Sequence, residues 1–191
     1  ERSAIPAEEM RSPMFLCDRQ SFSEFLKKRK TPQMAAFYKV QRSRLNILID
    51  NDGNPLGGQW SFDADNRKKL PKDVHPPELP GVVENCHLIA VKALVKAHFS
   101  DHPGNADDFN WPTTRAEALL WLDDFIANRL VDFGPYEDAM NSRSDTVFHS
   151  VLSPLMNIGL IIPEEVMERV TAAAQLRDIP LQSLEGFVRQ V

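Results

Sequence analysis

Phe133-Gly-Pro-Tyr-Glu-Asp-Ala-Met140 is followed nine residues later by His149-Ser-Val-Leu-Ser-Pro154 and then by Asn157-Ile-Gly159. A tyrosine-containing turn thus precedes two hydroxyl side chains at the predicted start of a helix. The first N–H groups of a helix lack intrahelical partners and lie at the positive end of its dipole. Ser150 and Ser153 could therefore hold an anionic group there, although the spacing alone equally fits a capped helix and a packed turn.

The composition limits the classes of protein to consider. The 191 residues carry a net charge of -5, with 42% hydrophobic and 26% charged residues, which is typical of a globular protein. Any basic face must therefore be local. Cys17 and Cys86 lie far apart and outside a CxxC pattern, which favours buried free thiols in a cytoplasmic protein over a metal site or a disulfide. No apolar run approaches the ~18 residues of a membrane span.

The two ends of the sequence suggest a piece of a longer protein. The chain begins with Glu1 rather than Met, and it stops inside an amphipathic helical pattern, Leu184-Glu-Gly-Phe-Val-Arg-Gln-Val191. That pattern contains no capping or breaking residue, so we expect the helix to continue beyond it.

Helical patterns dominate the chain. Ser21-x-x-Glu24 is a capping-box signature that predicts a helix over 22–29, and Thr31-Pro32 predicts the start of a second. Thr114-x-x-Glu117 is another capping box, and it opens a helix with a core stripe to Leu130. Apolar residues from 82 to 99 predict a helix that packs along one side. Further helices are expected at 149–157, 164–176 and 181–191.

One segment departs from the helical pattern. A β-branched run over 45–50, an Asp52-Gly53 turn and an aromatic run over 55–62 predict a short β-hairpin. Residues 63–80 are polar and contain four prolines, which is typical of a linker.

Three segments of the chain together match one known family. Met34-Ala-Ala-Phe-Tyr38 leads into Gly57-Gly-Gln-Trp-Ser-Phe-Asp-Ala-Asp-Asn-Arg-Lys68, which has the form GGxWxFDxxNRK. Trp111-Pro and Arg115-Ala precede the segment that begins at Phe133, and His149-Ser-x-Leu-Ser-Pro154 forms the third motif. These segments resemble the cryptochrome/photolyase family, and within it the bacterial iron–sulfur branch of prokaryotic (6-4) photolyases and related cryptochromes. The closing Glu185-Gly-Phe-Val-Arg-Gln190 is similar to the lead-in of that branch's GWRE segment.

The resemblance implies a mainly α fold and a domain organisation. Residues 1–20 would be the tail of an N-terminal α/β antenna domain, and 21–80 an interdomain linker with two helices and a hairpin. Residues 81–191 would be the N-terminal half of a helical FAD-binding domain. The family's iron–sulfur ligands lie further along the chain, so the cluster and a lumazine antenna are expected only in the longer parent protein, with no metal here.

The family's flavin contacts carry over to five residues. They match positions that hold the diphosphate and ribityl chain of FAD: Tyr136, His149, Ser150, Leu152 and Ser153. His149 stands where many relatives have Thr, so a donor is kept while its length and charge differ. In the alternative interpretation, the serines cap and bend a helix while the tyrosine packs in a turn.

Three linker residues are assigned to the DNA- and lesion-binding side: Asp63, Asn66 and Arg67. The planar guanidinium of Arg67 suits a phosphate. Asp63 could bind a hydrated Mg²⁺ or hydrogen-bond a flipped base. The alternative is that Asp63 and Asn66 cap turns while Arg67 forms a solvated ion pair.

Two further groups of residues allow more than one interpretation. The basic run over 27–30, with Arg42 and Arg44 beyond it, is either a solvated helix end or a stripe that tracks phosphates with salt-dependent affinity. The three tryptophans favour core packing over electron hopping; they are Trp60, Trp111 and Trp121.

The function that the resemblance implies is light-driven DNA repair. In the parent protein, excited reduced FAD would donate an electron to a pyrimidine dimer, with a (6-4) lesion favoured, so the cofactor rather than a catalytic side chain performs the chemistry. The alternatives are a cryptochrome-type blue-light sensor and a folded fragment without flavin or activity. We also expect exposed apolar surface, with dimerisation or domain swapping through residues 181–191.

Overall fold

The computed structural model describes residue 8 and residues 10–191, and it confirms a mainly helical fold. Within these residues the extended pairing is limited to isolated bridges. None of the described helices is long and apolar enough to cross a membrane. The α-helices are α1 (Arg19–Lys27), α2 (Met34–Leu45), α3 (Cys86–His98), α4 (Arg115–Asn128), α5 (Leu130–Phe133), α6 (Ser153–Asn157), α7 (Pro163–Leu176) and α8 (Leu181–Gln190).

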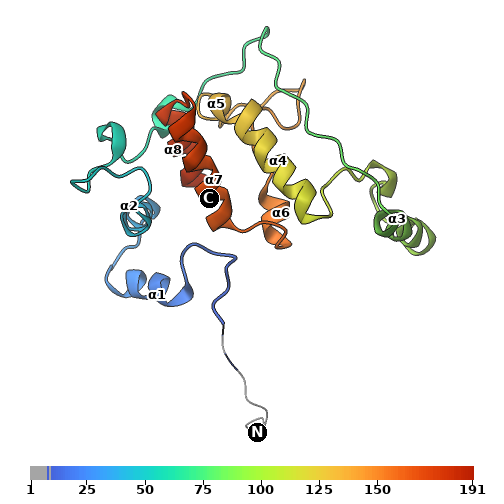
Figure 1. Ribbon diagram of the computed structural model, residues 1–191, viewed down its shortest axis with the longest axis horizontal. Helices are drawn as coiled ribbons and strands as arrows, with labels where there is room; N and C mark the ends of the chain where they lie inside the picture. Colours follow the sequence, from blue (N-terminus) through green and yellow to red (C-terminus); the bar gives the residue numbers. More distant parts are fainter. Residues whose placement is uncertain (1–7, 9) are drawn as a thin grey trace.

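The hydrophobic core lies among α4, α5, α7 and α8, which pack together in Figure 1. Phe125 of α4 and Phe187 of α8 place their ring centroids 4.8 Å apart, and Phe133 meets Phe187 edge to face at 5.6 Å. Most of α8 is buried. The expectation that residues 181–191 expose an apolar face is therefore wrong, because α5, α7 and the linker cover that helix.

Local side-chain chemistry explains where the helices begin. The capping box of α4 is present as predicted, with Thr114 and Glu117 bonded reciprocally. The predicted cap of α1 is wrong, since the Asp18 carboxylate accepts from the Ser21 N–H at 2.7 Å and starts the helix earlier. The helix expected from residue 149 begins only at Ser153, because Val151 has a φ of 52°.

The predicted hairpin is reduced to one antiparallel bridge between Ile49 and Pro55. Its turn is present, and the Asp50 carboxylate accepts from the Asn54 N–H at 2.7 Å. The strands are absent from this part of the described chain because Asn46 and Leu48 adopt left-handed φ values of 52° and 53°. Pro55 also lacks an N–H to donate to a ladder. The linker that follows is irregular apart from two short 3₁₀ turns, η1 (Leu56–Gly58) and η2 (Asp63–Asp65).

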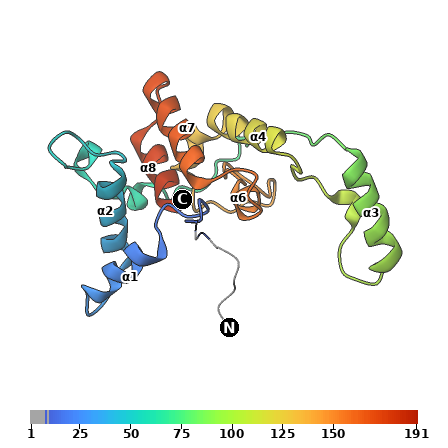
Figure 2. The same ribbon diagram turned by 60° about the horizontal axis from the view of Figure 1, so that its bottom comes forward.

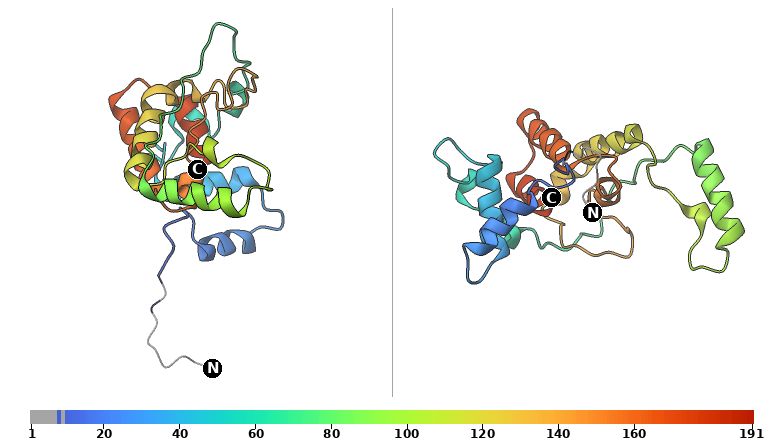
Figure 3. Two further views of the ribbon diagram at one scale, coloured as in Figure 1. Left: turned by 90° about the vertical axis from the view of Figure 1, so that its right-hand side faces the viewer. Right: turned by 90° about the horizontal axis from the view of Figure 1, so that it is seen from below.

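Helix α3 stands away from the helical core, as Figures 2 and 3 show. It packs against a third 3₁₀ turn, η3 (Ala106–Asp108). Leu88 is buried, but Val91 and Leu94 are each more than half exposed. The expected one-sided packing of this stripe is therefore wrong, and exposed apolar surface lies here instead. Cys86, at the start of α3, is a free thiol and exposed rather than buried.

Gly134 permits the close approach of α5 to α8. A Cβ built at this position would lie 2.7 Å from both Cα and N of Ser183, which are backbone atoms that cannot turn aside. Gly134→Ala is therefore expected to lower the free energy of unfolding by about 1–3 kcal/mol. Urea denaturation measures this, with Gly81→Ala as the matched control because a Cβ there meets nothing within 4 Å. Equal losses in the two variants would contradict the prediction.

Candidate functional site

The predicted lesion-binding segment of the linker packs against α8. Asn66 is 1% exposed, and its Nδ2 donates to Glu137 Oε2 at 3.0 Å and to the Gln182 carbonyl at 3.3 Å. Gly186 makes room for it, because a Cβ there would lie 2.7 Å from that same nitrogen. Asn66 therefore fixes the linker to the helical core rather than offering its side chain to solvent.

Arg189 of α8 joins carboxylates from three parts of the chain. Its guanidinium lies 3.3 Å from Asp63 Oδ1 in the linker and 2.9 Å from Glu137 Oε2 in the loop after α5. A third contact, at 3.5 Å, reaches Glu185 one turn earlier on α8. One arginine side chain thus contacts three carboxylates, two of them from distant segments, and reduces the repulsion among them.

Glu185 is the most deeply placed member of this site, with no exposed surface. Its Oε1 accepts from the hydroxyl of Tyr38 at 2.7 Å, and its Oε2 accepts from the Phe62 N–H at 2.9 Å. The carboxylate therefore connects α2 and the linker to α8. We call these residues the linker network: Tyr38, Asp63, Asn66, Glu137, Glu185 and Arg189.

Arg67 lies at the outer edge of the linker network and remains largely exposed. It forms an ion pair with Asp63, and its Nε lies 3.9 Å from Asp138 Oδ2. Of the three predicted lesion-binding residues, the structure thus brings Asp63 and Arg67 together at the surface and places Asn66 inside. The exposed guanidinium keeps N–H groups that could donate hydrogen bonds to the oxygens of a phosphate.

Because Tyr38 is half-buried in this site, we expect the stability of the fold to decrease at alkaline pH. Burial raises the pKa of Tyr38 well above its usual value of 10.0, and its hydrogen bond to Glu185 raises this pKa further. A raised pKa means that the folded state keeps a proton which the unfolded state loses. The contribution is complete below pH 10 and is lost as the pH rises toward the folded-state value.

We therefore expect the urea concentration at the midpoint of unfolding to decrease when the pH is raised above about 10. Tyr136→Phe leaves Tyr38 as the sole tyrosine, so ultraviolet absorbance in that variant follows its ionisation alone. Tyr38→Phe should remove most of the alkaline dependence that this group causes. An ordinary tyrosine titration in the folded Tyr136→Phe variant would contradict the prediction.

The five predicted flavin contacts occupy different environments. Tyr136 stacks on Phe148 with ring centroids 5.4 Å apart, in a small apolar cluster separate from the main core. The side chain of Leu152 is fully buried in the main core, so a ligand could meet only its backbone. His149 and Ser153 are exposed, whereas Ser150 is half-buried and its Oγ accepts from the Leu152 N–H at 3.5 Å.

A buried arginine holds the loop that carries these residues. Arg129 has no exposed surface; its Nη1 donates to the carbonyl of His149 at 3.0 Å, and its Nη2 pairs with Asp124 at 2.7 Å. Burial lowers the pKa of Arg129, opposed by the charge of Asp124. Sequence analysis missed this residue. Its position directly after the buried stripe of α4 was the available signal.

Two valines with left-handed backbone angles lie on either side of His149 in the loop that Arg129 holds. Val147 has a φ of 47° and Val151 a φ of 52°. These turns leave an imidazole and hydroxyls exposed or half-exposed on one loop, and such donors fit the oxygens of a diphosphate. Leu152 turns inward and Tyr136 is engaged with Phe148, so the side-chain donors left accessible among the five predicted contacts are those of His149, Ser150 and Ser153.

The tryptophans and Arg42 serve packing. Trp121 is 1% exposed and lies 5.6 Å from Trp111 between ring centroids. Arg42 is 2% exposed, lies over the ring of Trp60, and donates to the carbonyls of Ile47, Leu48 and Trp60. Arg42 is therefore unavailable to a phosphate. Among the described residues no group of three or more His, Cys, Asp or Glu side chains is placed to hold a metal ion.

Comparison with known proteins places the chain among relatives of photolyases. Residues 1–111 match the family described as deoxyribodipyrimidine photo-lyase-related protein. The chain is 32% identical over 177 residues to a (6-4) photolyase of Agrobacterium fabrum, an alignment covering 93% of this chain and 35% of that protein. It is also 39% identical over 57 residues to an uncharacterized protein of Acanthamoeba polyphaga mimivirus, covering 29% of this chain and 44% of that protein. The chain thus spans about a third of the photolyase that it matches.

Proposed function

Because the chain belongs to the deoxyribodipyrimidine photo-lyase-related family, we propose that it is part of a light-driven DNA-repair flavoprotein. The substrate would be a pyrimidine dimer, and the similarity to the (6-4) photolyase of Agrobacterium fabrum favours the (6-4) lesion. The observation that carries this proposal is the similarity to that protein along 93% of the chain, which includes both the linker motif and the loop around His149.

Bound FAD would supply the electron that splits the lesion. The residues of this chain would bind and orient the partners of that reaction. His149, Ser150 and Ser153 would donate to the diphosphate, whereas Tyr136 and Leu152 would shape the loop from behind. Arg67, supported by Asp63 and positioned through Asn66, would contact DNA near the lesion.

The finer assignment, to the iron–sulfur branch, rests on the linker motif between Gly57 and Lys68. We propose the same domain organisation as the sequence suggested, with a linker over 21–80 followed by part of a FAD-binding domain. The cluster, a lumazine antenna and the opposite side of the flavin site would belong to other parts of the parent protein. A cryptochrome-type light sensor is the second candidate, because it would use the same flavin contacts.

Repair is tested on the parent protein at the length of its photolyase relative. An oligonucleotide with a single (6-4) lesion is incubated with it in blue light and in the dark, and lesion loss is followed by chromatography. Light-dependent loss is expected. If the protein binds flavin but the lesion is not lost in the light, the repair function is rejected and the light sensor is the candidate that remains.

The 191-residue chain tests the third possibility, a folded fragment without flavin. We expect it to purify without the yellow colour of oxidised flavin and to retain no added FAD after gel filtration. The physical reason is that the proposed contacts form one side of a site. Stoichiometric retention of FAD would show that this chain holds a complete flavin site by itself.

A further inference from the structure

The charge of the chain is strongly segregated along the sequence. Residues 19–45, which comprise α1, α2 and their connection, contain eight Lys and Arg residues and one Glu, a net charge of +7. The remaining residues contain 14 Lys and Arg and 26 Asp and Glu, a net charge of -12. An acidic protein thus has one segment of net positive charge, formed by α1, α2 and their connection. Of its eight basic residues Arg42 is buried and the other seven are exposed, so the segment can attract a polyanion.

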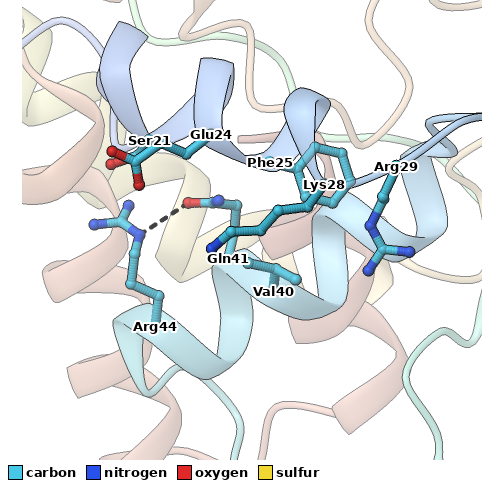
Figure 4. Close-up of a pocket in the computed structure, with 8 residues that line it drawn as sticks. All are labelled: Ser21, Glu24, Phe25, Lys28, Arg29, Val40, Gln41 and Arg44. Carbon is cyan, nitrogen blue, oxygen red and sulfur yellow. Dashed lines mark hydrogen bonds between the residues drawn. The ribbon is translucent and has the colours of Figure 1, made fainter.

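The two helices form a concave surface, which Figure 4 shows in close-up. The hollow has a volume of about 390 Å³. It is lined from α1 and the residues directly after it by Ser21, Glu24, Lys28 and Arg29, and from α2 by Val40, Gln41 and Arg44. The one carboxylate of this lining, Glu24, accepts from Gln20 Nε2 at 3.1 Å. The floor of the hollow contains Phe25, which is 8% exposed and lies 4.9 Å beneath the guanidinium of Arg29. We call this surface the α1–α2 groove.

Cations of this groove differ in how far they are already engaged. Arg44 donates to Gln41 Oε1 at 3.0 Å and to the carbonyl of Leu16, so it is partly engaged within the protein. In the described part of the chain, no carboxylate lies within 4.0 Å of Lys28 or Arg29, and the same holds for Lys27 and Lys30. All four are exposed. Free, clustered cations above a hollow are suited to phosphate oxygens.

The groove is held in place relative to the predicted lesion side. Tyr38 of α2 donates to Glu185, which also accepts from the Phe62 N–H directly before Asp63. The same α8 carboxylate therefore fixes the helix that carries part of the groove and the linker segment that carries Arg67. A polyanion on the groove would be positioned with respect to that segment.

We propose that the α1–α2 groove binds the sugar–phosphate backbone of duplex DNA, outside the lesion, through Lys28 and Arg29 with Lys27 and Lys30 beside them. This inference rests on the proposed function, which makes DNA the expected polyanion. Packing within the groove also favours DNA over an anionic membrane. Phe25, the aromatic ring of the groove lining, is 8% exposed and meets Phe37 edge to face at 5.2 Å, so this ring is engaged within the protein rather than free to enter lipid.

The test measures binding to a short undamaged duplex in the dark, by fluorescence anisotropy over a range of salt concentrations. Lys28→Gln/Arg29→Gln is compared with Lys96→Gln/Arg169→Gln, which removes the same charge from α3 and α7. The control residues form exposed ion pairs with Asp107 and Asp123, so their loss changes stability little. Circular dichroism verifies that both variants keep their helices.

We expect the groove variant to bind about 10- to 100-fold more weakly at about 0.1 M salt, with the logarithmic salt slope reduced by about 2. The control variant should behave as the unchanged chain. Equal effects in both variants would mean that overall charge alone acts, and would overturn the proposal. Unchanged DNA binding together with lost binding to phosphatidylserine vesicles would overturn it in favour of a membrane. Because this binding is measured without light or lesion, it can succeed where repair fails, and the reverse.

Discussion

Glu185→Ala is expected to lower the free energy of unfolding by about 3–5 kcal/mol, because it removes a fully buried carboxylate from its hydrogen-bond and ion-pair partners. The change leaves the Tyr38 hydroxyl and the Phe62 N–H without their acceptor and removes a carboxylate from Arg189. Unsatisfied buried donors each carry a desolvation cost, and the deleted atoms leave a void in a closely packed helix interface.

Urea denaturation followed by circular dichroism measures this loss, and two variants make it specific. Glu168→Ala removes an exposed glutamate from α7 and should change stability by less than about 0.5 kcal/mol. Glu185→Gln keeps the shape and an acceptor, so its loss should be smaller than that of the alanine variant. If Glu185→Ala and Glu168→Ala unfold at the same urea concentration, the linker network does not hold the linker to α8.

Arg129→Ala should cost about 3 kcal/mol and should also loosen the loop around His149. The guanidinium is fully buried, pairs with Asp124 and donates to the His149 carbonyl. Removing it leaves that carbonyl without this donor and takes the partner from Asp124, which is 21% exposed and can recover part of its hydration. Packing of the arginine stem is lost as well.

Arg169→Ala is the matched control, since it breaks an exposed ion pair with the neighbouring Asp123 and should cost at most about 1 kcal/mol. Amide hydrogen exchange separates a local effect from a global one. We expect faster exchange in the His149 loop of Arg129→Ala even under conditions where α4 stays protected. Unchanged exchange in that loop would show that the arginine stabilises the core without anchoring the loop.

The sequence predicted the helical core well because its signals are local. The Thr114 capping box and the apolar stripe up to Leu130 depend on neighbours within a few turns, and both are present in the structure. The hairpin failed at Leu48, whose left-handed φ no β-propensity indicates. The burial of α8 also escaped prediction, since it depends on Gly134 and on contacts with segments far away in the sequence.

The candidate site shows the same limit at the level of single side chains. The motif from Asp63 to Arg67 was identified, but its spacing does not tell which residues face solvent. Only the fold shows Asn66 turned inward to Glu137 and Arg67 turned outward. Arg129 was overlooked because a basic residue at a helix end is ordinarily solvated. Here a carbonyl 20 residues further along the chain accepts from it.

The left-handed Val147 and Val151 give the loop around His149 an energetic role. A β-branched residue in this conformation costs about 1–3 kcal/mol, and the cost is met by packing and by the hydrogen bond from Arg129. Folding has thus already ordered this loop before any ligand binds. Binding of a ligand to the loop would then not carry the conformational-entropy cost of ordering it, so affinity here would depend on preorganisation more than on the number of contacts.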